Sequence, residues 1–237
     1  MEMQNQVMGY DRTATMFSPD GHLLQVEYAE KTVRLGSSSI GFVCKDGVVI
    51  IADKRIKDRL ITADSTNKVH EVDDHLIMST AGILSDSRVL IEKAQLISQQ
   101  NRITYDSPVD VETVIKEIAN TMQAFTQYGG ARPFGASVML AGLSNNHPKL
   151  FVSDVTGNYF SYHASAIGEN DEKIKEMLRK DYKEDTTIDD SIKLGLKIFK
   201  NIQGKNFEID RFDVSYVNLE EKKLKRLFGD SLKKYNK

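Results

Sequence analysis

The stretch "FSPDGHLLQVEYAEKTVRLGSSSIGFV", residues 17–43, places a helical pattern directly before an apolar strand. We expect a helix over about residues 19–35, because Ser18 is suited to cap it, a proline suits its first turn, and Gly36 suits its end. The junction after this helix leaves two alternatives open. Either the helix is a leader that is removed to make Ser37 a reactive N-terminus, or it is retained and Ser37 stays inside the chain.

Strands and helices alternate in blocks beyond this junction. Asp46-Gly47 separates two apolar runs, which is typical of a β-hairpin. The expected elements are strands at 38–44, 48–53, 69–72 and 75–80, helices starting near 85 and 107, strands from 134, 149 and 158, helices around 174–178 and 188–199, and a hairpin at 212–228. No linker or repeat divides the chain. Hairpins favour antiparallel sheets and paired helices favour outer layers, so we predict one α+β domain with two sheets packed face to face between helices.

The composition excludes several classes of protein. The 237 residues carry a formal net charge of -2, which attracts neither phosphate backbones nor anionic lipid, so we expect no nucleic acid and no membrane partner. The single cysteine, Cys44, lies on an apolar run and is interpreted as a core residue in a reducing compartment. The N-terminal residues lack the pattern of a secretory signal, and no segment has the apolar length of a membrane span. We therefore expect a cytoplasmic protein.

Sequence motifs indicate little chemistry of the usual kinds. The histidines have no metal-ligand spacing, so we expect no metal and no cofactor. "GGARPFG", residues 129–135, lacks the lysine that a phosphate loop needs and is interpreted as a bend before a strand. One constellation remains: the hydroxyl of Ser37, the carboxylate of Asp53 and the amine of Lys68 could form a catalytic set if the nitrogen of Ser37 were free.

Several motifs resemble those of one family, in the expected order. They are "YDRTATMFSPDGHLLQVEYAEKTVRLGSSSIGF", "DGVVIIADKR", "NKVHEVDDHLIMSTAG", "SDSRVLIEKA", "QYGGARPFGASVMLAG" and "SAIGEN". Together they resemble proteasome α-type subunits. The motifs follow a generic α-type pattern, which is more similar to archaeal α subunits than to any one of the specialised eukaryotic α subunits. The resemblance covers residues 9 to about 200. It implies the N-terminal nucleophile hydrolase fold, a four-layer αββα sandwich, with residues 1–16 as a mobile gate segment and 17–237 as one domain.

The resemblance also favours one answer at the junction. In this family the β-type subunits are cut to expose a catalytic threonine, whereas the α-type subunits keep their N-terminal helix. It implies that no residue of this chain is catalytic and that the threonine active sites lie on β subunits. The alternative is an autoprocessed serine hydrolase with Ser37 as its nucleophile. A further alternative is a chaperone-like ring that works without β subunits.

The family implies a heptameric outer ring of α subunits that binds β subunits and admits unfolded polypeptides. The N-terminal helix and the "QYGGARPFG" region match the contacts between neighbouring α subunits, whereas the basic end "LKKYNK" is interpreted as a solvated tail. Docking of the C-terminal tails of ATPase regulators is implied between neighbours. The residues that match the gate are Tyr10, Asp11, Arg12, Pro19 and Tyr28, and those that match the tail-binding pocket are Gly36, Lys68, Gly82 and Ile83.

Overall fold

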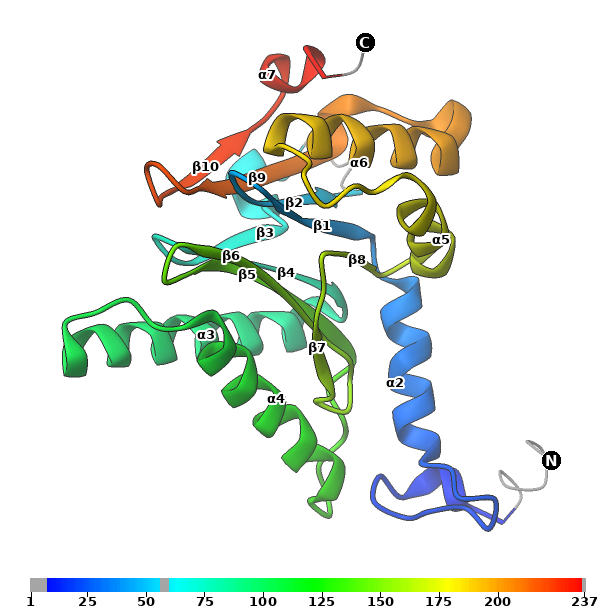
Figure 1. The fold of residues 1–237 in the computed structure, drawn as a ribbon. Coiled ribbons are helices and arrows are strands. Elements are labelled where there is room, and N and C mark those ends of the chain that lie inside the picture. The colour runs from blue at the N-terminus through cyan, green and yellow to red at the C-terminus, as the bar shows by residue number, and fades with distance from the viewer. Residues whose placement is uncertain (1–7, 56–59, 236–237) are drawn as a thin grey trace.

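The computed structural model describes residues 8–55 and 60–235 as a sandwich of four layers (Figure 1). Two five-stranded antiparallel sheets face each other, with one pair of helices outside each sheet. The first sheet has the order β10-β9-β2-β1-β8, formed by β1 (Ser39–Cys44), β2 (Gly47–Asp53), β8 (Ala164–Ile167), β9 (Phe212–Asn218) and β10 (Leu224–Leu227). The second has the order β3-β4-β5-β6-β7, formed by β3 (Val69–Asp73), β4 (Leu76–Gly82), β5 (Ala136–Ser144), β6 (His147–Ser153) and β7 (Tyr159–Ser161). The predicted α+β sandwich is confirmed.

Two pairs of long helices form the outer layers. Helices α3 (Leu84–Tyr105) and α4 (Val111–Gln127) cover the second sheet, and α5 (Asp171–Asp181) and α6 (Ile188–Gln203) cover the first. Three buried apolar clusters therefore lie between successive layers. Strand β2 is buried along its whole length because Val49 and Ile51 face the helices while Val48 and Ile50 face the other sheet. This two-sided burial explains why β2 reads as an unbroken apolar run.

Helix α2 (Leu24–Leu35) stands beside the sandwich, with the first described residues at its far end (Figure 1). Val26 and Ala29 of α2 form a small buried cluster with Val155, which follows β6. The helix begins at Leu24, so the prediction that it starts near residue 19 was wrong. Ser18–Gly21 forms a turn instead, closed by a 2.8 Å hydrogen bond from Gly21 N to Ser18 O. A proline suits the second position of such a turn as well as the first position of a helix.

Three further segments differ from the sequence-based expectation. Helix α4 begins at Val111 rather than near residue 107, because the side chain of Asp110 caps it there. The run that starts at residue 158 is not one strand, because β7 joins the second sheet and β8 joins the first. The C-terminal end is not simply solvated. It forms the short helix α7 (Asp230–Lys233), in which Leu232 is fully buried, and Tyr235 is 8% exposed and donates its hydroxyl to Asp189 Oδ1 at 2.5 Å. The sequence around Leu232 and Tyr235 is rich in lysine, which is more typical of a solvated segment.

The single cysteine has the structural role expected of it. Cys44 is buried in the cluster between the first sheet and its helices, 3.2 Å from Ser191 Oγ. Burial raises the pKa of its thiol to about 12, so the reactive thiolate is strongly disfavoured.

Candidate functional site

Lys68 lies where the chain enters β3, and its side chain reaches the junction between α2 and β1. Its Nζ donates hydrogen bonds to both the carbonyl oxygen and the hydroxyl of Ser37. Ser37 comes two residues before β1 and one residue after Gly36. The structure therefore brings together the lysine and the serine that the spacing had suggested.

Asp53, the third member of that constellation, has other partners. Arg211 donates to both of its carboxylate oxygens, with Nε 3.1 Å from Oδ1 and Nη2 2.7 Å from Oδ2. Gln203 Nε2 donates to Oδ2 at 2.8 Å, and the backbone N of Arg55 donates to Oδ1 at 3.1 Å. Among the described residues, the hydrogen-bond partners of Asp53 do not include Lys68, so the structure does not join the three side chains into one hydrogen-bonded set.

The environment of Lys68 lowers its pKa to about 7. The largest cause is burial, which disfavours the charged amine, and it outweighs the opposing attraction of Asp53. The positive charge of Arg55 lowers the pKa further, although Arg55 itself forms an ion pair with Glu169. Near neutral pH the amine of Lys68 is therefore poised between its neutral and charged forms, and an added negative charge beside it would favour the charged form.

A pocket of about 620 Å³ opens beside Lys68, between β3, β4 and the first turns of α3. Four cationic side chains line it, those of Lys54, Arg55, Lys68 and Arg88, together with one acid, Glu92, which pairs with Arg88 at 3.1 Å. Leu84 and Ile91 add an apolar wall from α3, and Leu84 is 81% exposed. The pocket therefore combines an excess of positive charge with apolar surface, a combination that suits the end of a peptide with a free carboxylate.

Two glycines allow the backbone to pass closely at the edge of this pocket. A Cβ on Gly36 would lie 2.3 Å from the backbone N of Gly82, and a Cβ on Gly82, whose φ is 123°, would lie 2.0 Å from the carbonyl oxygen of Gly135. Gly36 therefore serves this close approach, since its own φ of -69° is not the left-handed conformation of a helix-ending glycine. Gly82 lines the pocket, whereas Ile83 donates its backbone N–H to Gly135 O and is not among the residues that line the pocket.

The candidate gate residues gather at the opposite end of α2. Tyr10–Arg12 forms one turn of 3₁₀ helix, η1, which contributes no buried residue. Gln25 Nε2 of α2 donates to the carbonyl oxygen of Asp11 at 2.5 Å. Oδ1 of Asp11 is shielded from solvent and has no hydrogen-bond partner in the described part of the chain. A shielded oxygen of this kind costs free energy unless a donor is supplied from elsewhere.

Pro19 and Tyr28 hold different places around the same end. Pro19 is the second residue of the Ser18–Gly21 turn that precedes α2. Tyr28 lies on α2, with Lys31 Nζ 5.4 Å from its ring centroid. Tyr10, Asp11, Arg12, Pro19 and Tyr28 are thus all on or beside α2, while residues 1–7 of the expected gate segment lie outside the described residues.

The loop "GGARPFG" is held to the start of α3 by an ion pair that the sequence motifs did not indicate. Both guanidinium NH₂ groups of Arg132 bind Asp86, at 2.6 and 2.7 Å, and Gly135 N also donates to Asp86 at 2.9 Å. These bonds lower the pKa of Asp86, with the Arg132 hydrogen bonds as the largest cause. Gly130 and Arg132 also line a pocket of about 310 Å³ together with Asp11. The bend therefore lies next to η1.

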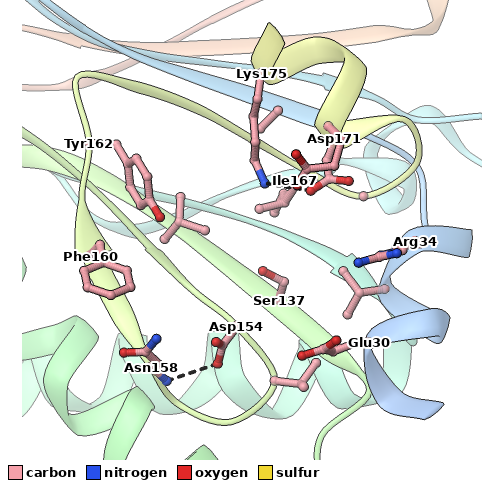
Figure 2. A pocket seen from close by; sticks show the side chains of 16 residues that line it. Glu30, Arg34, Ser137, Asp154, Asn158, Phe160, Tyr162, Ile167, Asp171 and Lys175 are labelled. Carbon is pink, nitrogen blue, oxygen red and sulfur yellow. Dashed lines mark hydrogen bonds and ion pairs between the residues drawn. The ribbon is translucent and has the colours of Figure 1, made fainter. Parts of the chain in front are cut away.

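Figure 2 shows a smaller pocket of about 250 Å³ where α2 meets the β6–β7 turn and the start of α5. Several of its polar groups bind one another within the chain. Lys175 Nζ lies 2.7 Å from Asp171 Oδ2, and Asp154 Oδ1 accepts the backbone N–H of Asn158 at 3.1 Å. Glu30 faces the same space from α2. This pocket contains neither Ser37 nor Lys68, so it is separate from the 620 Å³ pocket beside Lys68.

Within residues 8–55 and 60–235, no group of histidine, cysteine and acidic side chains could hold a metal ion. No helix in the same part of the chain combines the length and apolar character needed to cross a membrane.

Comparison with known proteins places the chain in a family. The family model "Proteasome subunit" matches residues 33–217, and the model of the N-terminal signature of A-type proteasome subunits matches residues 10–31. The chain belongs to the proteasome α-subunit family. Relatives named as proteasome α subunits include those of Methanosarcina mazei (42% identical, covering 99% of this chain and 94% of the relative), Methanosarcina acetivorans (41%, 96% and 92%) and Archaeoglobus fulgidus (41%, 96% and 92%).

Family membership identifies residues 10–31 as the N-terminal signature of A-type proteasome subunits. The α-type signature spans η1, the Ser18–Gly21 turn and the first two-thirds of α2, which are the elements that distinguish this chain from a bare sandwich. A proteasome α subunit is part of the 20S core of a protease complex and assembles with other proteasome subunits. The family resemblance and the fold inferred from the sequence are both confirmed.

Proposed function

We propose that this chain is a non-catalytic subunit of the 20S proteasome that forms the outer heptameric ring, gates substrate entry and docks C-terminal tails of ATPase activators. Its N-terminal segment, residues 1–16, acts as the gate, and its partners are neighbouring α subunits, β subunits and the ATPase regulatory particle. Unfolded polypeptides pass through the ring to threonine active sites on the β subunits, without a metal or cofactor in this chain. The setting is ATP-dependent protein degradation in the cytoplasm.

The observation that carries this proposal is the Lys68 pocket. The amine of Lys68 lies in a pocket that also offers apolar walls and a close-packed glycine edge. A peptide C-terminus supplies a carboxylate for the amine and side chains for the apolar walls. The backbone of the docking site is then formed by Gly36, Gly82 and Ile83. Ile83 holds this backbone in place through its hydrogen bond to Gly135 O.

The arrangement around α2 supports gating. A helix of 12 residues spans about 18 Å, so α2 links the docking pocket at its C-terminal end to η1 at its N-terminal end. Oδ1 of Asp11, which has no hydrogen-bond partner among residues 8–55 and 60–235, leaves an acceptor for a donor on a neighbouring subunit, such as the hydroxyl of its tyrosine. Pro19 fixes the turn that directs the N-terminal segment, because its ring restricts the backbone. Such contacts favour two discrete arrangements of the segment.

The pH dependence of tail binding tests the docking role of Lys68. The free pocket holds Lys68 at a pKa of about 7, and a bound carboxylate would raise that pKa, so binding takes up a proton above pH 7. The affinity for a tail peptide should therefore be highest below pH 7 and should fall by about 30-fold between pH 6 and pH 8.5. Burial and Arg226 lower the pKa of His70, the other titratable group of the pocket near neutrality, so His70 stays uncharged over most of this range.

Lys68→Arg is the matched control for that titration, because arginine stays charged throughout the range. Fluorescence anisotropy of a labelled tail peptide should show a steep pH profile for the unaltered ring and a flat one for Lys68→Arg. A flat profile for the unaltered ring would contradict docking through Lys68.

The same lysine supports a second candidate function, an autoprocessed serine hydrolase. An amine with a pKa of about 7 beside Ser37 Oγ could act as the base that activates this hydroxyl as a nucleophile. The surrounding backbone opposes this interpretation. Gly36 O accepts a 2.8 Å hydrogen bond from Glu169 N, and Ser38 Oγ donates to Glu169 O at 2.5 Å. These bonds and the packing of α2 hold the peptide before Ser37 in place.

Intact mass spectrometry of the purified chain distinguishes the two functions. We expect a mass that includes the N-terminal segment, apart from the initiator methionine. A mass that begins at Ser37 would show that α2 is a leader, and the chain would then be expected to hydrolyse peptides by itself.

A further inference from the structure

Asp213 is a buried acid whose position connects it to the docking pocket. It lies on β9 in the first sheet, is fully buried, and its Oδ2 accepts the backbone N–H groups of Lys68 and Val69, both at 2.9 Å. Strand β3 belongs to the second sheet, so this one oxygen joins the two sheets where β3 begins. Arg226 of β10 places Nη1 3.5 Å from the same oxygen. We propose that Asp213 is a positioning residue that fixes the backbone of Lys68 and thereby aims its amine into the docking pocket.

The place of β3 in its sheet explains why such a residue is needed. β3 is an edge strand, and its pairing with β4 starts at Val69, so the backbone N–H of Lys68 precedes the ladder. A shielded N–H without a ladder partner needs another acceptor. A carboxylate that accepts two N–H groups makes charge-assisted bonds, which are stronger than those of a neutral acceptor. Asp213 therefore fixes the two peptide groups from which the Lys68 side chain extends.

The carbonyl side of Lys68 is held independently. Ser79 Oγ of β4 lies 3.1 Å from Lys68 O and donates to it, and Ser39 Oγ of β1 lies 2.8 Å from Ser79 Oγ. Lys68 is thus held through its own N–H by one sheet and through its carbonyl by a chain of hydroxyls that also crosses between sheets. Its Nζ points to Ser37, which leads into β1. These contacts leave the long side chain little freedom at its base, so less entropy is lost when a carboxylate binds.

The inference rests on the proposed docking function, and a double-mutant cycle separates the two. The probe is a synthetic peptide that ends in a hydrophobic residue, tyrosine and one further residue, and its affinity for the assembled ring is measured by fluorescence anisotropy. Asp213→Asn should weaken binding by about 5- to 10-fold in the unaltered ring and have no further effect in a Lys68→Met ring. A merely structural role would give equal losses in both backgrounds, and that result would overturn the proposal.

Two other variants keep the experiment decisive. Asp46→Asn is the matched control. Asp46 Oδ1 also accepts a backbone N–H, from Ile188 at 2.9 Å, but Asp46 does not line the pocket. The affinity of the Asp46→Asn ring for the peptide should therefore be unchanged. Ser79→Ala takes the place of Asp213→Asn if the latter ring does not assemble, and should weaken binding by about 3-fold, again only when Lys68 is present. If Lys68→Met alone binds the peptide normally, the docking function fails. If Lys68→Met weakens binding while Asp213→Asn and Ser79→Ala do not, only the positioning role fails.

Discussion

Replacing Lys68 by alanine is expected to abolish the stimulation of peptide hydrolysis by activator tails in the assembled 20S particle. The substitution removes the amine that would meet the tail carboxylate, and a hydrogen bond to a charged group contributes roughly 1.5–3 kcal/mol, which corresponds to about a 10- to 150-fold loss of affinity. The basal rate should be unchanged, because Lys68 lies in the pocket and not with η1. The measurement is the hydrolysis rate of a short fluorogenic peptide as a function of tail concentration.

Assembly and stability should survive this substitution. Burial lowers the pKa of Lys68 and so makes its charge unfavourable in the free subunit, and relief of that cost offsets the loss of the hydrogen bonds from Nζ to Ser37. Lys68→Met keeps most of the side-chain volume and should give the same loss of stimulation as alanine. Lys54→Ala removes a positive charge from the same pocket but leaves the amine beside Ser37, and should change the tail concentration for half-maximal stimulation by less than about 3-fold. Normal stimulation of the Lys68→Met particle would move the docking site elsewhere.

The core of the fold could be inferred from the sequence because it follows local rules. Asp46-Gly47 does connect β1 and β2, whose register pairs Cys44 with Gly47. The apolar period of α4 corresponds to its buried face, which includes Val114, Ile118 and Met122. These signals depend on residues close in sequence, and the physical causes, turn conformation and burial of one helix face, act over the same distance.

The remaining features depend on contacts between distant segments. Asp213 and Lys68 are 145 positions apart, and no periodic pattern connects a single acid on β9 to the start of β3. Asp53 likewise binds Arg211 and not Lys68, because a guanidinium offers two parallel donors to one carboxylate. Of the candidate site, the sequence therefore indicated the serine, the lysine and the glycine frame. The charged residues that orient them became apparent only from the packed sheets.

Local ambiguity explains the remaining error around α2. The Ser18–Gly21 turn uses the residue types that also begin helices, and the deciding feature is Gly21, whose φ of 81° cannot continue into a helix. The turn separates the signature residues of η1 from α2 and changes the direction of the chain before the helix, which is the geometry that the proposed gate requires.

Deleting residues 2–12 is expected to open the pore of the particle and to raise the hydrolysis of small peptides several-fold without any activator. The deletion removes η1, which contributes nothing to the buried core, so the sandwich and α2 should remain intact. It also removes the carbonyl of Asp11, and with it the hydrogen bond from Gln25 that connects the N-terminal segment to α2. If the closed arrangement is favoured by a few kcal/mol, its loss moves most particles to the open one.

Gln25→Leu tests whether the hydrogen bond from Gln25 to Asp11 holds the gate closed, because it preserves the length of the N-terminal segment and removes only the donor to Asp11. It should raise basal hydrolysis by less than the deletion, and the two changes combined should equal the deletion alone. The same deletion in particles whose β subunits are inactivated should show no hydrolysis, which assigns the gained activity to entry rather than to this chain. Unchanged hydrolysis in the active deletion particle would contradict a gate formed by these residues, because the closed segment would then present no barrier to remove.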